Sequence, residues 1–100
     1  MNVLILGGGG REHTFCWKLG QSPLCTEIFV APGNAGTQQK ATNLPIDPMN
    51  FEAVRQAILT HNIGMLVVGP EAPLVAGIHD FIEADKALEG VLVIGPEKLA

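Results

Sequence analysis

A run of four glycines followed by an arginine is the feature of this sequence best suited to binding an anion. Gly7–Gly10 follow a short aliphatic run, and Arg11 comes next, at the expected start of a helix. Glycine has no Cβ atom, so backbone N–H groups of such a loop and of the helix start can approach an anion closely. The Arg11 guanidinium group would add a positive charge and paired hydrogen-bond donors. The pattern predicts a phosphate-binding loop, and the alternative is a tight turn that binds nothing.

The same loop does not match the common nucleotide-binding signatures. A G-x-G-x-x-G motif that began at Gly7 would place Glu12 where its third glycine belongs. The acidic residue that holds an adenosine ribose in such folds ends the second strand, whereas Glu27 stands at the beginning of that strand. No Gly-Lys-Ser/Thr follows the glycines, which excludes a P-loop. One phosphate of a small metabolite therefore fits better than a dinucleotide.

Glu12 falls in the first turn of the helix expected after the glycines, on its inner face beside Phe15 and Leu19. A carboxylate there points toward the mouth of the sheet, where it could contact a ligand. The alternative is a partner for the helix dipole, worth about 0.3–1 kcal/mol.

A second loop, Ala31–Gly36, follows the second expected strand. Pro32 and Gly33 shape its turn, and Asn34 tolerates the left-handed conformation while offering both a donor and an acceptor. On spacing alone, a binding loop and a simple turn are both open.

A third loop, Gly69–Leu74, holds a single acid, Glu71, between Pro70 and Pro73. Two prolines restrict the backbone and reduce the entropy lost on ordering. A stiffened carboxylate beside a phosphate site suits ribose hydroxyl groups, which would donate hydrogen bonds to it. The alternative is a solvated loop acid.

Strands and helices that alternate along the chain would position these loops. Aliphatic runs predict strands over Asn2–Leu6, Glu27–Val30, Ala41–Ile46, Met65–Val68 and Val91–Ile94. Pro45 makes Ala41–Ile46 more suitable for the edge of a sheet than for its centre. Apolar stripes predict helices from Arg11 to about Gln21, from Asp47-Pro48 to Asn62 and Gly64, from Pro73 onward, and from Pro96 to the end of the chain.

This alternation predicts a Rossmann-like, three-layer α/β/α fold with a parallel sheet. We expect the strand order 3-2-1-4-5, which makes strands 1 and 4 neighbours at the point where the order reverses. Ligands of such sheets bind outside the carboxyl ends of the strands at that point. The three loops above leave those ends.

Composition limits the classes of partner. The 100 residues suit one domain, 47% are hydrophobic, and the net charge of −4 includes only six basic residues. Nucleic acid and anionic membrane surfaces are therefore poor partners.

Val3–Leu6 is too short for a signal peptide or a membrane span, so we expect a cytoplasmic protein. Cys16 and Cys25 are expected as reduced thiols, and no metal-ligand spacing, catalytic triad or Mg²⁺-binding carboxylate cluster is evident.

Taken together, three motifs resemble the glycinamide ribonucleotide synthetase family, also called phosphoribosylamine–glycine ligases. They are Gly8–His13, Ala31–Thr37 and Val68–Ile78, and Gly95-Pro96 agrees with the family's next segment. The resemblance implies an ATP-grasp ligase of purine biosynthesis. Such an enzyme joins glycine to 5-phosphoribosylamine through an acyl phosphate, giving glycinamide ribonucleotide, ADP and phosphate.

The resemblance further implies that residues 1–100 are an N-terminal, pre-ATP-grasp, substrate-binding domain without catalytic or metal-binding residues. ATP and Mg²⁺ (or Mn²⁺) would bind in the ATP-grasp domain, outside this chain, so the 100 residues alone would be inactive. Their partners would be 5-phosphoribosylamine and the rest of the same polypeptide. A free-standing Rossmann-like nucleotide-binding module remains the alternative.

The resemblance assigns the 5-phosphate to the glycine loop and the ribose hydroxyls to Glu71. Glu12 and Asn34 would meet the sugar amine or orient the loops. The expected substrate-binding residues are Gly8, Gly9, Gly10, Arg11, Glu12, Pro32, Gly33, Asn34, Gly69, Pro70 and Glu71.

Overall fold

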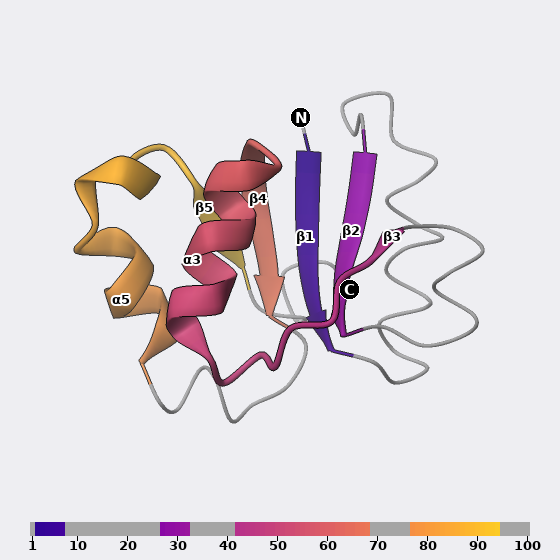
Figure 1. Cartoon of the computed structure of the whole chain (residues 1–100). Helices are drawn as coiled ribbons and strands as arrows, with labels where there is room; N and C mark the ends of the chain where they lie inside the picture. Colours follow the sequence, from indigo (N-terminus) through magenta and orange to yellow (C-terminus); the bar gives the residue numbers. More distant parts are fainter. Residues whose placement is uncertain (1, 8–26, 33–41, 69–76, 95–100) are drawn as a thin grey trace.

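The computed structural model describes residues 2–7, 27–32, 42–68 and 77–94 of the chain (Figure 1). In this part, five strands form one sheet in the order β3-β2-β1-β4-β5, and every neighbouring pair is parallel. The strands are β1 (Asn2–Gly7), β2 (Glu27–Pro32), β3 (Thr42–Asn43), β4 (Ile63–Val68) and β5 (Leu92–Ile94). The expected strand order and Rossmann-like α/β class are confirmed.

The sheet is apolar on both faces, as a parallel sheet covered on both sides requires. In the central strand β1, Leu4 and Leu6 belong to the core on one face, whereas Val3 and Ile5 belong to the core on the other. Leu4 stands in register with Phe29 of β2 and Leu66 of β4, all three buried. This alternation explains why β1 is a continuous aliphatic run.

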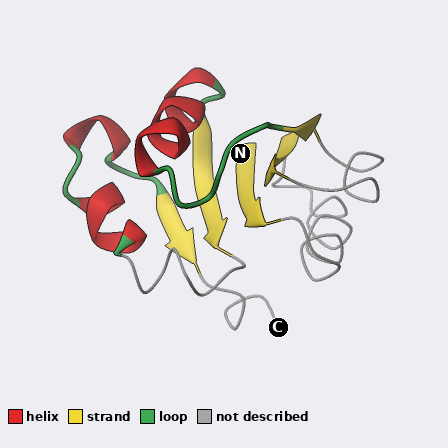
Figure 2. Cartoon of the chain, turned by 60° about the horizontal axis from the view of Figure 1, so that its bottom comes forward, coloured by secondary structure: helices red, strands yellow, loops and turns green. Residues whose placement is uncertain are grey.

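The described helices lie on one side of the sheet (Figures 1 and 2). They are α3 (Phe51–Thr60), α5 (Ile78–Glu83) and the short 3₁₀ helix η1 (Lys86–Leu88). They bury Val54, Ala57 and Ile58 of α3, Ile78 and Ile82 of α5, and Leu88 of η1 against the sheet. The helix expected over residues 11–21 and the one expected from Pro96 lie outside the described residues.

Helix α3 begins later than the sequence predicted. Asn50, not Asp47, is its N-cap, and the Asn50 side chain accepts a hydrogen bond from the Ala53 N–H at 3.1 Å. The Asp47 side chain instead accepts from the Met49 N–H at 2.9 Å, in the turn before the helix. Both residue types cap helices well, so the sequence pattern could not separate the two starts.

The end of α3 also differs from the prediction. The helix ends at Thr60, Asn62 adopts a positive φ of 53°, and the next strand begins at Ile63. Gly64 therefore lies inside β4 and does not end the helix. Asparagine tolerates the left-handed conformation, which completes the reversal within two residues of α3.

The observed bounds of β3, α5 and β5 also differ from the predicted ones, in each case because of the backbone. The Leu44 N–H still donates to the Val30 carbonyl, but Pro45 has no N–H to extend the ladder, so β3 is shorter than expected. Gly77 has a φ of 95°, so α5 begins at Ile78 and not as a helix continuous from Pro73. Val91 donates to the Leu88 carbonyl in a turn, so β5 begins one residue late.

No helix among the described residues is long and apolar enough to cross a membrane.

Candidate functional site

The carboxyl ends of three neighbouring strands form the candidate site. Gly7 ends β1 and stands in register with Pro32 at the end of β2, while Leu6 stands in register with Val68 at the end of β4. The three predicted loops each begin within one or two residues of these ends. The topology therefore brings the starting points of all three loops to one edge of the sheet, at the reversal of strand order.

Gly7 has a conformation that only glycine adopts readily. It is buried, it closes β1, and its φ is 136°. A Cβ atom at this φ strains the backbone, so the first of the four glycines has a structural reason independent of any ligand.

Pro32 is the one predicted binding residue within the described part of the chain. It is exposed at the carboxyl end of β2, follows a cis peptide bond with Ala31, and lies opposite Gly7. Its contact with substrate stays a prediction. The remaining predicted residues lie outside the described residues: Gly8, Gly9, Gly10, Arg11, Glu12, Gly33, Asn34, Gly69, Pro70 and Glu71.

Glu27 lies at the opposite end of its strand from this edge, as the sequence indicated. It is in register with Asn2 at the amino end of β1. Pro32 is five positions further along the strand, a distance of roughly 16 Å at about 3.3 Å per residue. Glu27 therefore cannot serve as the ribose-binding acid of a dinucleotide site at the carboxyl edge.

Two surface hollows among the described residues lie away from the candidate site. One, of about 440 Å³, is at the amino ends of β1, β4 and β5, where its lining includes Asn2, Gly64 and Glu89. The other, of about 660 Å³, runs along the end of α5 and η1. Sequence reasoning identified neither hollow; the first joins residues 2, 62–64 and 89–91, which are far apart in the chain, and the second is formed within residues 82–91.

A short ionic contact joins α3 to the residue that caps η1. Arg55 Nε donates to Asp85 Oδ2 at 2.5 Å, and Asp85 Oδ1 accepts from the Ala87 N–H at 2.9 Å. The hydrogen bond from Arg55 lowers the pKa of Asp85, and the same bond raises the pKa of Arg55. Asp85 thus caps η1 and holds it to α3, which is a structural role.

The two described histidines differ in surroundings. His61 is half-buried, and its ring lies 4.4 Å from that of Phe29, centre to centre. His79 is exposed, and its Nε2 is 3.0 Å from Glu83 Oε1. Sequence spacing could not reveal the first contact, since Phe29 is on β2 and His61 follows α3.

His79, Asp80 and Glu83 bring three possible metal ligands together on α5, although the sequence showed no metal-ligand spacing. All three side chains are exposed, so they provide no shielded site. We assign no ion to them.

The chain is similar to known proteins over its whole length. The family model described as "Phosphoribosylglycinamide synthetase, N domain" matches residues 1–100. The chain is 50% identical over 99 residues to a phosphoribosylamine–glycine ligase of Rhodopirellula baltica, covering 99% of this chain and 22% of that protein. It is 48% identical over 103 residues to the one of Haemophilus influenzae, covering 100% of this chain and 23% of that protein. The chain therefore spans less than a quarter of the length of these relatives.

Proposed function

The chain belongs to the phosphoribosylglycinamide synthetase N-domain family, and on that premise we propose that it is the N-terminal, substrate-binding domain of a phosphoribosylamine–glycine ligase. The complete enzyme would join glycine to 5-phosphoribosylamine at the expense of ATP, in the cytoplasm. Residues 1–100 would form its pre-ATP-grasp domain, followed by the ATP-grasp and C-terminal domains.

In this proposal the chain holds the phosphosugar. The glycine run and Arg11 would bind the 5-phosphate, and Glu71 would accept hydrogen bonds from the ribose hydroxyls. Holding one reactant in a productive geometry can contribute roughly 7–11 kcal/mol to lowering a barrier. The contribution of the chain to catalysis would thus be positioning, and it would be inactive alone.

One observation carries the proposal. The parallel strand order places the ends of β1, β2 and β4 side by side, and each of the family's three motifs begins at, or within one residue of, one of these ends. A phosphosugar is small enough to contact loops that leave three adjacent strands. The position of Glu27 at the amino edge argues against the alternative of a dinucleotide-binding module.

Among the described residues, the one group of three possible metal ligands, on α5, is exposed and offers no shielded site for an ion. We propose that ATP and Mg²⁺ bind in the domain outside this chain.

Substitution of Gly10 by valine in the full-length enzyme tests the phosphate assignment. A side chain in the loop would block approach of the phosphate to the backbone. We expect the KM for 5-phosphoribosylamine to rise at least tenfold, by about 1.4 kcal/mol or more of binding free energy, with little change for ATP and glycine. Steady-state kinetics with each substrate varied in turn provides the measurement.

Thr60→Val is a suitable control, because Thr60 is exposed at the end of α3, away from the site. The Thr60→Val enzyme should keep the same KM values for 5-phosphoribosylamine, ATP and glycine. If Gly10→Val instead raised the KM for ATP and left the KM for 5-phosphoribosylamine unchanged, the loop would be a nucleotide site. The phosphate assignment would then be wrong.

A further inference from the structure

We propose that an apolar strip formed by Leu92, Ile94 and Met65 is the surface on which the remainder of the polypeptide, absent from this chain, docks. Leu92 and Ile94 belong to β5, the last strand of the described sheet, and Met65 belongs to its neighbour β4. The proposal rests on the length of the family's members and not on their reaction.

Burial falls steadily across one face of the sheet toward this strip. Along one row of register partners, Val3 of β1 is 1% exposed, Met65 of β4 is half-buried, and Leu92 of β5 is 52% exposed. The next row repeats the trend, since Ile5 and Val67 are fully buried and Ile94 is half-buried. On this face, the described side chains are therefore more exposed the nearer their strand is to β5.

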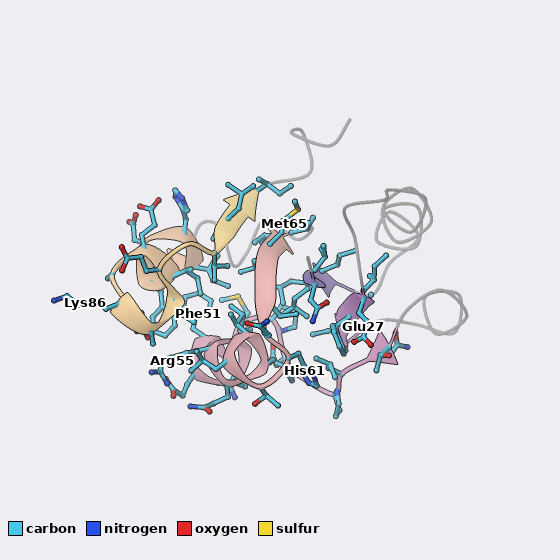
Figure 3. The ribbon with its side chains drawn as sticks, turned by 90° about the horizontal axis from the view of Figure 1, so that it is seen from above. Glu27, Phe51, Arg55, His61, Met65 and Lys86 are labelled. Atoms are coloured by element: carbon cyan, nitrogen blue, oxygen red, sulfur yellow. The ribbon has the colours of Figure 1, made fainter. Side chains whose placement is uncertain are left out.

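The opposite face of the same strand has a cover. Val93, between Leu92 and Ile94, packs against the core that α3, α5 and η1 complete. Figure 3 shows Met65 on the side of the sheet away from Arg55 of α3. A parallel strand is normally buried on both faces, and no described helix lies on the Leu92 side of β5.

The remainder of the polypeptide is the occupant that best fits this gap. The relatives are more than four times as long as the chain, so most of each relative lies outside the matched segment. Leu92 is the most exposed of the large hydrophobic side chains in the described part, and exposed apolar patches mark contact surfaces. A membrane is a poor alternative, because the net charge is −4.

Hydroxyl-radical footprinting of the unmodified full-length protein tests this proposal. Leu92 and Leu59 are the same residue type, and in this chain they are 52% and 42% exposed, so without a cover Leu92 should oxidise at least as fast. We expect Leu92 to oxidise roughly tenfold more slowly than Leu59, because the centre of an interface excludes water. Equal rates would overturn the proposal.

Photo-crosslinking identifies the occupant. With benzoylphenylalanine in place of Leu92 in the full-length protein, the crosslinked peptide should come from the same molecule and from beyond residue 100. The same group in place of Leu59 serves as the control and should give no such product. A crosslink between two copies, protection of Leu92 that disappears on dilution, or a crosslink within residues 1–100 would contradict the proposal. Neither readout depends on turnover, so both remain decisive if the proposed reaction is wrong.

Discussion

At the scale of single residues, the first glycine of the run Gly7–Gly10 and the three that follow it are explained by different causes. Gly7 is required by the backbone, because it is buried with a φ of 136° at the end of β1. The glycines at positions 8, 9 and 10 are assigned to the phosphate by the family resemblance and by their place after that strand. A substitution at each kind of glycine should therefore affect a different property, stability in one case and sugar affinity in the other.

Gly7→Ala should lower the free energy of unfolding of the chain by about 1–3 kcal/mol, the cost of holding a non-glycine residue in a sparsely populated conformation. Urea denaturation followed by circular dichroism measures the change. Gly64→Ala is the matched control, since Gly64 lies within β4 and is not among the positive-φ glycines. A similar loss at both positions would show that the φ of Gly7 is not the cause.

Glu71→Gln in the full-length enzyme should reduce kcat/KM for 5-phosphoribosylamine roughly tenfold. Hydrogen bonds to a charged group contribute about 1.5–3 kcal/mol, against about 0.5–1.5 for neutral ones, and about 1.4 kcal/mol is a factor of ten. The constants for glycine and ATP should change little. Glu89→Gln, at an exposed residue of the amino edge, is the control and should behave as the unmodified enzyme. If kcat/KM for 5-phosphoribosylamine were unchanged in Glu71→Gln, the assignment of Glu71 to the ribose hydroxyls would be wrong.

At the scale of elements, the contact between Arg55 and Asp85 connects α3 with η1 across 30 residues of sequence. The Arg55 hydrogen bond lowers the pKa of Asp85 in the folded chain below its ordinary value of 3.8. A carboxyl group with a lowered folded pKa stabilises the fold above its unfolded pKa. That stabilisation is lost as the pH falls through the folded value.

The stability difference between the unmodified chain and Asp85→Asn should therefore be constant from neutral pH down to about pH 5 and should shrink below about pH 4. Asparagine can still cap η1, so the pH-dependent part reports the ion pair. Thermal unfolding at a series of pH values gives this comparison, with Asp80→Asn, an exposed residue of α5, as the control. A difference that stayed constant to pH 2 would show that the ion pair contributes nothing.

The sequence could predict the strands and their order, because aliphatic runs alternate with amphipathic helices and crossovers are right-handed. It could not place the start of α3, since Asp47 and Asn50 are both good caps, nor the break at Gly77, which depends on backbone conformation. Contacts between distant segments were also out of reach, as with His61 and Phe29. For the site, the edge of the sheet and the place of Pro32 followed from topology, and the roles of its loop residues came from the family resemblance.

At the scale of the whole molecule, we propose two surfaces of different use. The carboxyl edge, where β1, β2 and β4 end side by side, would bind a ligand, and the strip around Leu92 on β5 would offer an apolar surface to the rest of the polypeptide. A domain that supplies one substrate surface and one docking surface would position the phosphosugar without carrying out the reaction itself. The carboxyl edge is formed by the ends of β1, β2 and β4, whereas the strip is centred on Leu92 at the amino end of β5, so each surface can be tested separately.

The central claim is that the carboxyl edge of this sheet binds the phosphosugar, and chemical-shift mapping of the 100-residue chain with glycinamide ribonucleotide tests it most directly. The account predicts that the amides of Gly7, Ala31 and Val68, at the carboxyl ends of their strands, shift with added ligand, while those of Asn2 and Ile63 at the amino ends do not. NAD at the same concentration should leave all of them unchanged. Shifts confined to the amino ends, or a response to NAD and none to glycinamide ribonucleotide, would contradict the account.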